Sequence, residues 1–448
     1  MSFKPTQPAQ QSLDNLNHVE VLDVLMGSGK TYASLRHIES MVLANKQVKW
    51  VFCTEFLSEI ATRTVENEEA KHLWRTPEKV GEETKMDDFI NLLEEPNVQL
   101  IAITHALFKQ AATNYEVQQL VAKHGWCLFL DETIECINPY GGISPADFMW
   151  HKDAGRISID EGAYGRVQWL DDSVLDYDIK EMAIGRMLKA QDNLYAYING
   201  KQLSLVAIEP KVMFTMWHRV ILSTYQFEST LMDAYFRMKE IDWKPCTDIV
   251  CHRLATKAEI KANITMINKH NPAFRNISLS ASWYEDKATA DDFALINKTL
   301  RNIGDSHGCK GKPELFGYTL PKSALGKRSD KKKIQPAGYK HTVCLIDVDG
   351  AEIAGTVDKQ RSGHIPCNAR ASNEYAGKVV MVHAFDRHPN VIVSNYLRAM
   401  NVSFSKERFA VNELVQWVWR SAIRNGQPIH VAILSKRMRD LFINWLDN

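Results

Sequence analysis

The sequence predicts an α/β fold built on parallel sheets, and three observations support this prediction. Apolar runs with strand composition alternate with helical stretches, a glycine-rich turn joins the first strand to the first helix, and the composition is ordinary for a globular protein, with 45% hydrophobic and 24% charged residues. Strands that alternate with helices form a parallel sheet with helices on both faces, and such a sheet binds its ligand at the carboxyl ends of its strands. The predicted strands of the first half are 19–26, 47–54, 98–105, 126–132 and 219–226.

The length of 448 residues corresponds to about three domains, although two large ones are equally compatible with it. We expect two, 1–240 and 241–448. Residues 139–210 interrupt the alternation and read as an insertion in the first. Asn199-Gly200 between two strand-like runs predicts a tight hairpin there. The insertion could contact nucleic acid or separate strands, or it could only stabilise its parent domain.

The 54 Lys and Arg residues balance the 54 Asp and Glu residues, so a histone-like basic coat is excluded but a local basic groove is not. The first residues lack an apolar signal core, and no run approaches about 18 apolar residues, so we expect a cytoplasmic protein that spans no membrane. Eight scattered cysteines form no C-x-x-C pair, which favours reduced, buried thiols. Cys246, Cys251 and His252 lack a second ligand pair, which disfavours zinc.

The stretch LMGSGKT, residues 25–31, lies between the first strand and the first helix and predicts a phosphate-binding loop (P-loop). Glycines let the backbone curl so that its N–H groups approach phosphate oxygens, and the helix directs its positive end at the same anion. A lysine then reaches the β- and γ-phosphates, and a threonine hydroxyl binds Mg²⁺. The full pattern would have glycine at position 24, where this chain has Val24, so a glycine turn without ligand is the alternative. The predicted nucleotide-binding residues are Gly27, Ser28, Gly29, Lys30 and Thr31.

Asp131 and Glu132 end the apolar strand 126–132 at the edge where the nucleotide is expected. Asp131 can hold Mg²⁺, and Glu132 can polarise the attacking water. The alternative is an acidic pair that leaves a buried strand for solvent. At the end of the strand 219–226, Ser223 and Thr224 could couple the nucleotide to the second half of the protein, or one could be a helix N-cap.

In the second half, the pattern predicts strands at 277–283, 343–348 and 379–383 and a helix at 289–303. The lysine-rich stretch 309–340 could contact a phosphate backbone or could be a solvated loop.

A helix is predicted over 411–424, with Val411, Leu414, Val415, Val418 and Ala422 on one apolar stripe. Gln416, Arg420 and Arg424 are spaced i, i+4, i+8 on the opposite side. Arginine presents a rigid fork of donors to phosphate oxygens, and an arginine finger contributes on the order of 10³–10⁵ in rate. An ordinary solvated face is the alternative.

The order of these pieces resembles motifs I, II, III, V and VI of superfamily 2 DExD/H-type helicases, most closely the bacteriophage-encoded members. The segments that carry the resemblance are GSGKT, Asp131 to Ile134, Ser223 to Tyr225, Asn368 to Asn373 and Gln416 to Arg424. The resemblance implies two RecA-like domains in tandem, ATP with Mg²⁺ in the cleft between them, and a nucleic-acid strand across both. Segments 54–60 and 104–108 lie where this family has motifs Ia and Ib. With motif V they imply nucleic-acid contacts at Thr54, Thr104, His105, Arg370 and Asn373.

The chain departs from the family pattern in three places. Motif II reads D-E-T-I, no upstream glutamine motif for adenine is present, and Trp419 replaces the usual glycine of motif VI. The second arginine of motif VI also falls one place late, which leaves Arg420 and Arg424 open as the finger. The expectation is an ATP-dependent helicase or translocase acting on DNA or RNA, in phage replication or recombination within the host cytoplasm. An ATP-gated clamp that does not unwind, or a genome-packaging ATPase, are the alternatives.

Overall fold

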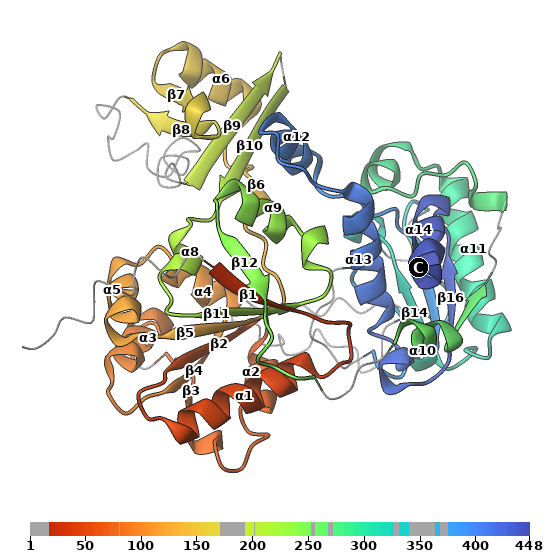
Figure 1. The fold of residues 1–448 in the computed structure, drawn as a ribbon. Helices are drawn as coiled ribbons and strands as arrows, with labels where there is room; N and C mark the ends of the chain where they lie inside the picture. The colour runs from red at the N-terminus through yellow and green to blue at the C-terminus, as the bar shows by residue number, and fades with distance from the viewer. Residues whose placement is uncertain are drawn as a thin grey trace, which may run out of the picture. The chain divides into compact units, whose positions relative to one another are not determined.

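The computed structural model describes residues 18–79, 81–170, 193–200, 202–251, 256–267, 272–326, 331–339, 363–367 and 375–448. The chain divides into two compact units (Figure 1). The first comprises residues up to Asp23, Thr31–Val250 and Pro389–Ser405. The second comprises Val24–Lys30, Cys251–His388 and Lys406–Asn448. Residues 389–405 follow the predicted boundary near 240 by almost 150 positions, yet they pack in the first unit.

The first unit is built on a seven-stranded sheet in the order β12-β1-β11-β5-β2-β4-β3. Every pairing in it is parallel. The strands β2 and β5 are buried along their whole length, which explains why they read as continuous apolar runs. The five predicted strands of this half are confirmed, with shorter bounds. The strands are β1 His18–Asp23, β2 Trp50–Thr54, β3 Trp74–Arg75, β4 Leu100–Thr104, β5 Cys127–Asp131, β11 Val220–Thr224 and β12 Asp242–Pro245.

Helices cover this sheet, and several begin at side-chain caps. Thr84 and Asp87 form a capping box at α3, and Asn114 caps α5, which ends at Gly125 in the left-handed region. The helices are α1 Lys30–Ala44, α2 Leu57–Arg63, α3 Lys85–Glu94, α4 His105–Ala111, α5 Tyr115–His124, α8 Val212–Thr215 and α9 Leu231–Met238.

The predicted insertion forms a separate sheet, β6-β10-β9-β8-β7, whose pairings are antiparallel. The predicted hairpin is confirmed, but Asn199 pairs with Gln202, so Asn199 lies within the strand and the turn begins at Gly200. Its elements are β6 Ile137–Pro139, α6 Pro145–Asp153, β7 Ile157–Asp160, β8 Arg166–Trp169, β9 Leu194–Asn199 and β10 Gln202–Ile208.

The helix α12, Val391–Ala399, comes from the late part of the sequence and packs on β10 of the insertion (Figure 1). Tyr396 and Leu397 are buried in the same apolar core as Val206. The Tyr396 hydroxyl donates a hydrogen bond to the Tyr164 carbonyl oxygen, 2.7 Å away. Further along, the Arg237 guanidinium donates to the Ser403 hydroxyl.

The second unit contains a four-stranded parallel sheet in the order β13-β16-β15-β14. The predicted strand 379–383 and helix 289–303 are confirmed as β15 and α11. The elements are α10 Lys257–Ala262, β13 Ile264–Ile267, α11 Ala290–Ser306, β14 Phe316–Thr319, β15 Val380–His383, α13 Lys406–Val418, β16 Ile429–Ile433 and α14 Lys436–Asp447.

Two expectations for this half are wrong. The predicted strand 277–283 is irregular and turns into a helical segment, because Leu279 has φ 53° and the Ser280 hydroxyl accepts a hydrogen bond from the Trp283 N–H. The stretch 309–340 is not one solvated loop, since it contains the fully buried strand β14. The predicted strand 343–348 lies outside the described residues.

Candidate phosphate-binding site

The carboxyl ends of three neighbouring strands bring the predicted catalytic residues of the first unit to one edge of its sheet. The strand β11 lies between β1 and β5 and pairs with both. In register, Asp23 is beside Thr224, and Ser223 is beside Asp131. Residues separated by roughly a hundred positions in the sequence therefore lie side by side where an α/β sheet binds its ligand.

The loop 24–30 joins β1 to α1, and both of its glycines adopt the left-handed region. Gly27 and Gly29 each have φ +76°, a conformation that glycine adopts without the cost other residues incur. Lys30 is only 8% exposed, and its ammonium group donates to the Val24 carbonyl oxygen at 2.8 Å. Ser28 is 1% exposed, and its hydroxyl has no hydrogen-bond partner among the described residues. A buried hydroxyl and N–H groups at a helix start suit an anion.

Thr31, in the first turn of α1, contacts Asp131 at the end of β5. The Thr31 hydroxyl donates to the carboxylate, with Oγ1 3.0 Å from Oδ1 and 3.0 Å from Oδ2. Asp131 is 7% exposed. A hydroxyl and a carboxylate are hard oxygen donors, which Mg²⁺ prefers, so this pair fits the predicted metal. Among the described residues, no three His, Cys, Asp or Glu side chains gather as a metal site.

Glu132 stands in an unusual backbone conformation. Its φ is 72°, which is uncommon for a residue with a side chain, and its N–H donates to the Ser223 carbonyl oxygen at 2.9 Å. Strained backbone of this kind concentrates at functional sites, where surrounding structure holds it. The conformation redirects the chain just after the buried strand, and Glu132 is half-buried rather than fully solvated.

The hydroxyls at the end of β11 are buried and lack hydrogen-bond partners in the part of the chain that the structure describes. Ser223 and Thr224 are both 0% exposed. Neither is a helix N-cap, because α9 is capped by Thr230 and the 3-10 turn before it begins after Gln226, so that alternative is wrong.

Sequence reasoning missed Asp23 at the neighbouring strand end. Its carboxylate accepts hydrogen bonds from the backbone N–H groups of Gln226 at 2.6 Å and Phe227 at 2.9 Å. Asp23 thereby fixes the segment after β11 beside the end of β1. A lone acidic residue after an apolar strand was the available signal.

The predicted arginine face does not form as one helix surface. The helix α13 ends at Val418, because the Ala422 N–H donates to the Lys378 carbonyl oxygen and not to a carbonyl of the helix. The chain then forms a 3-10 turn, Ala422–Asn425. The apolar stripe is buried as predicted. Gln416 donates to the Asn412 side chain at 3.1 Å. Arg420 is 8% exposed, so it is not part of a solvated face, whereas Arg424 is half-buried.

Trp419, which stands where the resembled motif has glycine, packs on the phosphate loop residue Gly27 within the second unit. A Cβ atom added at Gly27 would overlap the Trp419 ring, whereas the same atom at Gly29 would meet nothing within 4 Å. Only glycine at position 27 therefore accommodates this ring.

The residues predicted to contact nucleic acid divide into two groups. Thr54 and Thr104 are neighbours in register at the ends of β2 and β4, and His105 begins α4. Thr54 is buried, and the Thr104 hydroxyl caps α4 by accepting from the Leu107 N–H at 3.4 Å. Arg370 and Asn373 lie outside the described residues.

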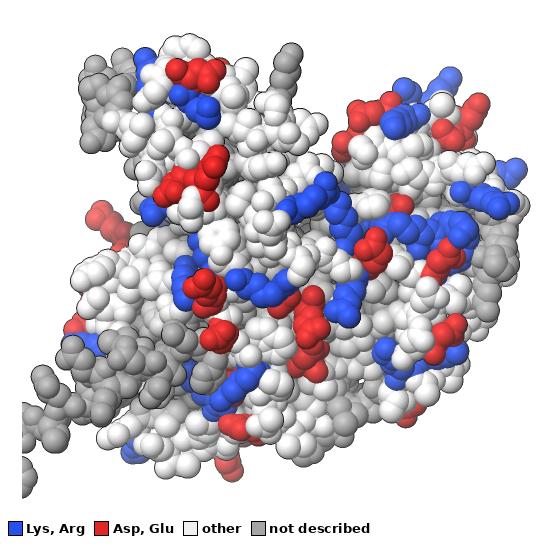
Figure 2. Space-filling view, turned by 45° about the horizontal axis from the view of Figure 1, so that its top comes forward, with Lys and Arg blue, Asp and Glu red and all other residues white. Residues whose placement is uncertain are grey.

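The charge of the visible surface is mixed. Figure 2 shows acidic and basic side chains interspersed on that face, in keeping with the balanced totals. No helix among the described residues is long and apolar enough to cross a membrane.

Comparisons with known proteins support an α/β protein with a Rossmann-like C-terminal region. Residues 255–446 match the family model described as the YonV C-terminal Rossmann-like domain, which agrees with the parallel sheet of the second unit. The chain is also similar to the SPbeta prophage-derived uncharacterized protein YonV of Bacillus subtilis (strain 168). The two are 26% identical over 459 residues, which cover 97% of this chain and 100% of that protein.

Proposed function

We propose that this chain hydrolyses a nucleoside triphosphate, ATP, at the loop 24–30 and the carboxyl edge of β5. The observation that carries the proposal is the contact of Thr31 with both carboxylate oxygens of Asp131, 100 residues away in sequence. A threonine after Gly-Lys and an acidic strand end in contact form the arrangement that holds Mg²⁺ beside a phosphate chain.

Each residue has a role that its position supports. The N–H groups of the loop and the start of α1 bind phosphate oxygens, and Lys30 exchanges the Val24 carbonyl for the β- and γ-phosphates. Thr31 and Asp131 would hold Mg²⁺, which neutralises charge on the phosphates when bound. Glu132 orients a water molecule and accepts its proton as the water oxygen bonds to the γ-phosphorus and the bond to the β–γ bridging oxygen breaks.

Coupling of this hydrolysis to nucleic acid is the second part of the proposal. The motif order supports a helicase or translocase of the superfamily 2 type with two RecA-like domains, and the prophage origin of the relative fits a phage role. The residues proposed to contact the nucleic-acid strand are Thr54, Thr104, His105, Arg370 and Asn373. Gln416 and one of Arg420 and Arg424 sense the γ-phosphate. An ATP-gated clamp would use the same residues as a helicase and would differ only in leaving the duplex unseparated.

The test is phosphate release with ATP and Mg²⁺, with and without single-stranded DNA or RNA. We expect stimulated turnover in the wild type and its loss in Lys30→Ala, with the exposed Lys46→Ala as matched control. Wild-type protein that neither binds nor hydrolyses any nucleotide would refute the proposal. Strand displacement on tailed duplexes then separates a helicase from a clamp.

A further inference from the structure

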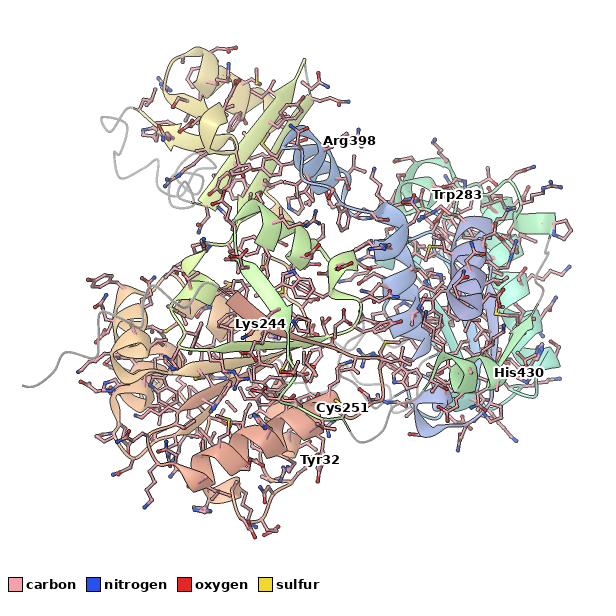
Figure 3. The ribbon with its side chains drawn as sticks, viewed as in Figure 1. Tyr32, Lys244, Cys251, Trp283, Arg398 and His430 are labelled. Carbon is pink, nitrogen blue, oxygen red and sulfur yellow. The ribbon has the colours of Figure 1, made fainter. Side chains whose placement is uncertain are left out.

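Tyr32 is an exposed aromatic residue directly after the phosphate loop. It lies in the first turn of α1 (Figure 3), and 51% of its surface is exposed. Among the described residues, the largest fully buried side chains are aromatic, whereas the Tyr32 ring is open to a ligand beside the phosphate loop.

The ring is held in place from one side. The Arg36 guanidinium carbon lies 5.2 Å from the Tyr32 ring centroid, a cation–π arrangement one helical turn along α1. Arg36 is itself fixed, because its Nη1 lies 3.1 Å from Oε2 of Glu39.

Glu39 anchors this arrangement rigidly. It is 0% exposed, and its other oxygen accepts from the Trp74 indole N–H at 2.9 Å, while Asn67 donates to Oε2 at 2.9 Å. A buried, fully bonded carboxylate therefore positions Arg36, and Arg36 covers one face of Tyr32. Since the residue remains half exposed, its uncovered surface is a preorganised stacking platform.

The position of Tyr32 matches the path of a nucleotide. Its backbone N–H is among the first N–H groups of α1, which have no partner within the helix and can bind phosphate. In the proposed function Lys30 binds the β- and γ-phosphates and Thr31 the Mg²⁺ beside them, so the next residue is placed to meet the α-phosphate, the sugar and then the base. Resting on the proposed function, we infer that Tyr32, backed by Arg36, stacks on the base of the bound nucleoside triphosphate.

This assignment also accounts for the missing glutamine motif. A stacking ring recognises the π-face that every base has, without reading its hydrogen-bonding edge. The protein then accepts ATP and GTP with similar KM.

The experiment measures KM for ATP and GTP, and competitive inhibition by inorganic tripolyphosphate, which has no base. We expect Tyr32→Ala to raise both KM values by roughly 5- to 100-fold with little change in kcat. The inhibition constant of tripolyphosphate stays unchanged, and Tyr32→Phe behaves as wild type. Tyr115→Ala, which alters a 73% exposed tyrosine of the same unit, is the matched control.

An unchanged KM in Tyr32→Ala would overturn the inference while leaving the proposed function intact. An equal rise in KM and in the tripolyphosphate constant would also overturn it, since the residue would then act through the loop. Weakened binding of single-stranded DNA with an unchanged KM would assign the ring to nucleic acid instead. Absence of nucleotide binding and turnover in the wild type would refute the proposed function, and this inference with it.

Discussion

The backbone N–H of Glu132 donates to the carbonyl oxygen of Ser223 at 2.9 Å, and this bond holds Glu132 at φ 72°. Ser223 belongs to β11, which lies between β1 and β5. This strand thus sets the direction in which Glu132, the residue proposed to orient the water, leaves the sheet. A backbone conformation that is costly for glutamate is retained at the residue proposed to orient the water.

Glu132→Gln keeps the shape of the side chain and removes its ability to accept a proton. We expect turnover to fall by on the order of 10²–10⁴ with nucleotide affinity preserved, because general-base catalysis contributes that much. Phosphate release and equilibrium nucleotide binding measure the two effects. Glu135→Gln, on an exposed side chain nearby, should leave both unchanged.

Glu132→Gly should make the protein more stable and inactive at once. Glycine populates positive φ freely, so the variant gains about 1 kcal/mol in free energy of unfolding by relief of strain. Urea unfolding of the two Glu132 variants in parallel separates the backbone effect from the loss of the carboxylate. A Glu132→Gly variant less stable than wild type would contradict the strain argument.

Thr31→Val removes the hydroxyl that contacts Asp131 and preserves the branched shape. We expect the Mg²⁺ concentration that gives half-maximal turnover to rise at least tenfold, because a metal ligand is lost. Thr31→Ser retains the hydroxyl and should remain close to wild type. Equal metal dependence in the valine and serine variants would show that the hydroxyl is no ligand.

Gly27→Ala and Gly29→Ala form a matched pair, since both positions have φ +76° but only the first has a neighbour at its Cβ position. We expect Gly29→Ala to lower the free energy of unfolding by about 1 kcal/mol, because alanine is strained at this φ. Gly27→Ala should cost clearly more, since the methyl group overlaps the Trp419 ring. In a double-mutant cycle with Trp419→Ala, which removes the ring, the two glycine variants should lose the same free energy of unfolding.

His383, at the end of β15, should make stability depend on pH. Burial lowers its pKa from 6.5 to about 3, so the folded protein keeps the imidazole neutral where the unfolded chain protonates it. Above pH 6.5 the imidazole is neutral in both states and does not lower the free energy of unfolding. As the pH falls from 6.5 towards 3, the free energy of unfolding decreases by up to about 1.4 kcal/mol per pH unit.

The measurement is urea unfolding at pH 5 and pH 7 for wild type and His383→Phe. Phenylalanine can keep the edge-on contact with Trp417, whose ring centroid lies 5.2 Å away, and cannot titrate. The difference in stability between the two pH values should shrink in the variant. An unchanged difference would show that other groups set the acid sensitivity.

Local patterns predicted the first sheet well, because buried parallel strands are continuous apolar runs, and the glycine-lysine-threonine stretch marked the point where its first strand gives way to its first helix. Two of the failures have different causes: one arose from local backbone and side-chain geometry, and the other from a tertiary contact. The segment 277–283 has the alternation of a strand, but Leu279 turns into the left-handed region and Ser280 starts a helix. The periodicity of 411–424 continues beyond Val418, yet a hydrogen bond from Ala422 to the neighbouring chain segment ends the helix. The sequence did not predict that Arg36 and Glu39 support Tyr32, because Glu39 is held by Trp74 and Asn67, which lie about 30 residues further along the chain.

The packing of α12 in the first unit has a consequence for synthesis of the chain on the ribosome. Val393, Tyr396 and Leu397 complete an apolar core whose other members were made well over a hundred residues earlier. Domains usually fold as they are made, beginning with the N-terminal one. Here the first unit cannot close until residue 405 has left the exit tunnel, by which time most of the second unit is already synthesised. The two halves must therefore mature together, and a nascent chain stalled near residue 250 should display the β10 surface to chaperones.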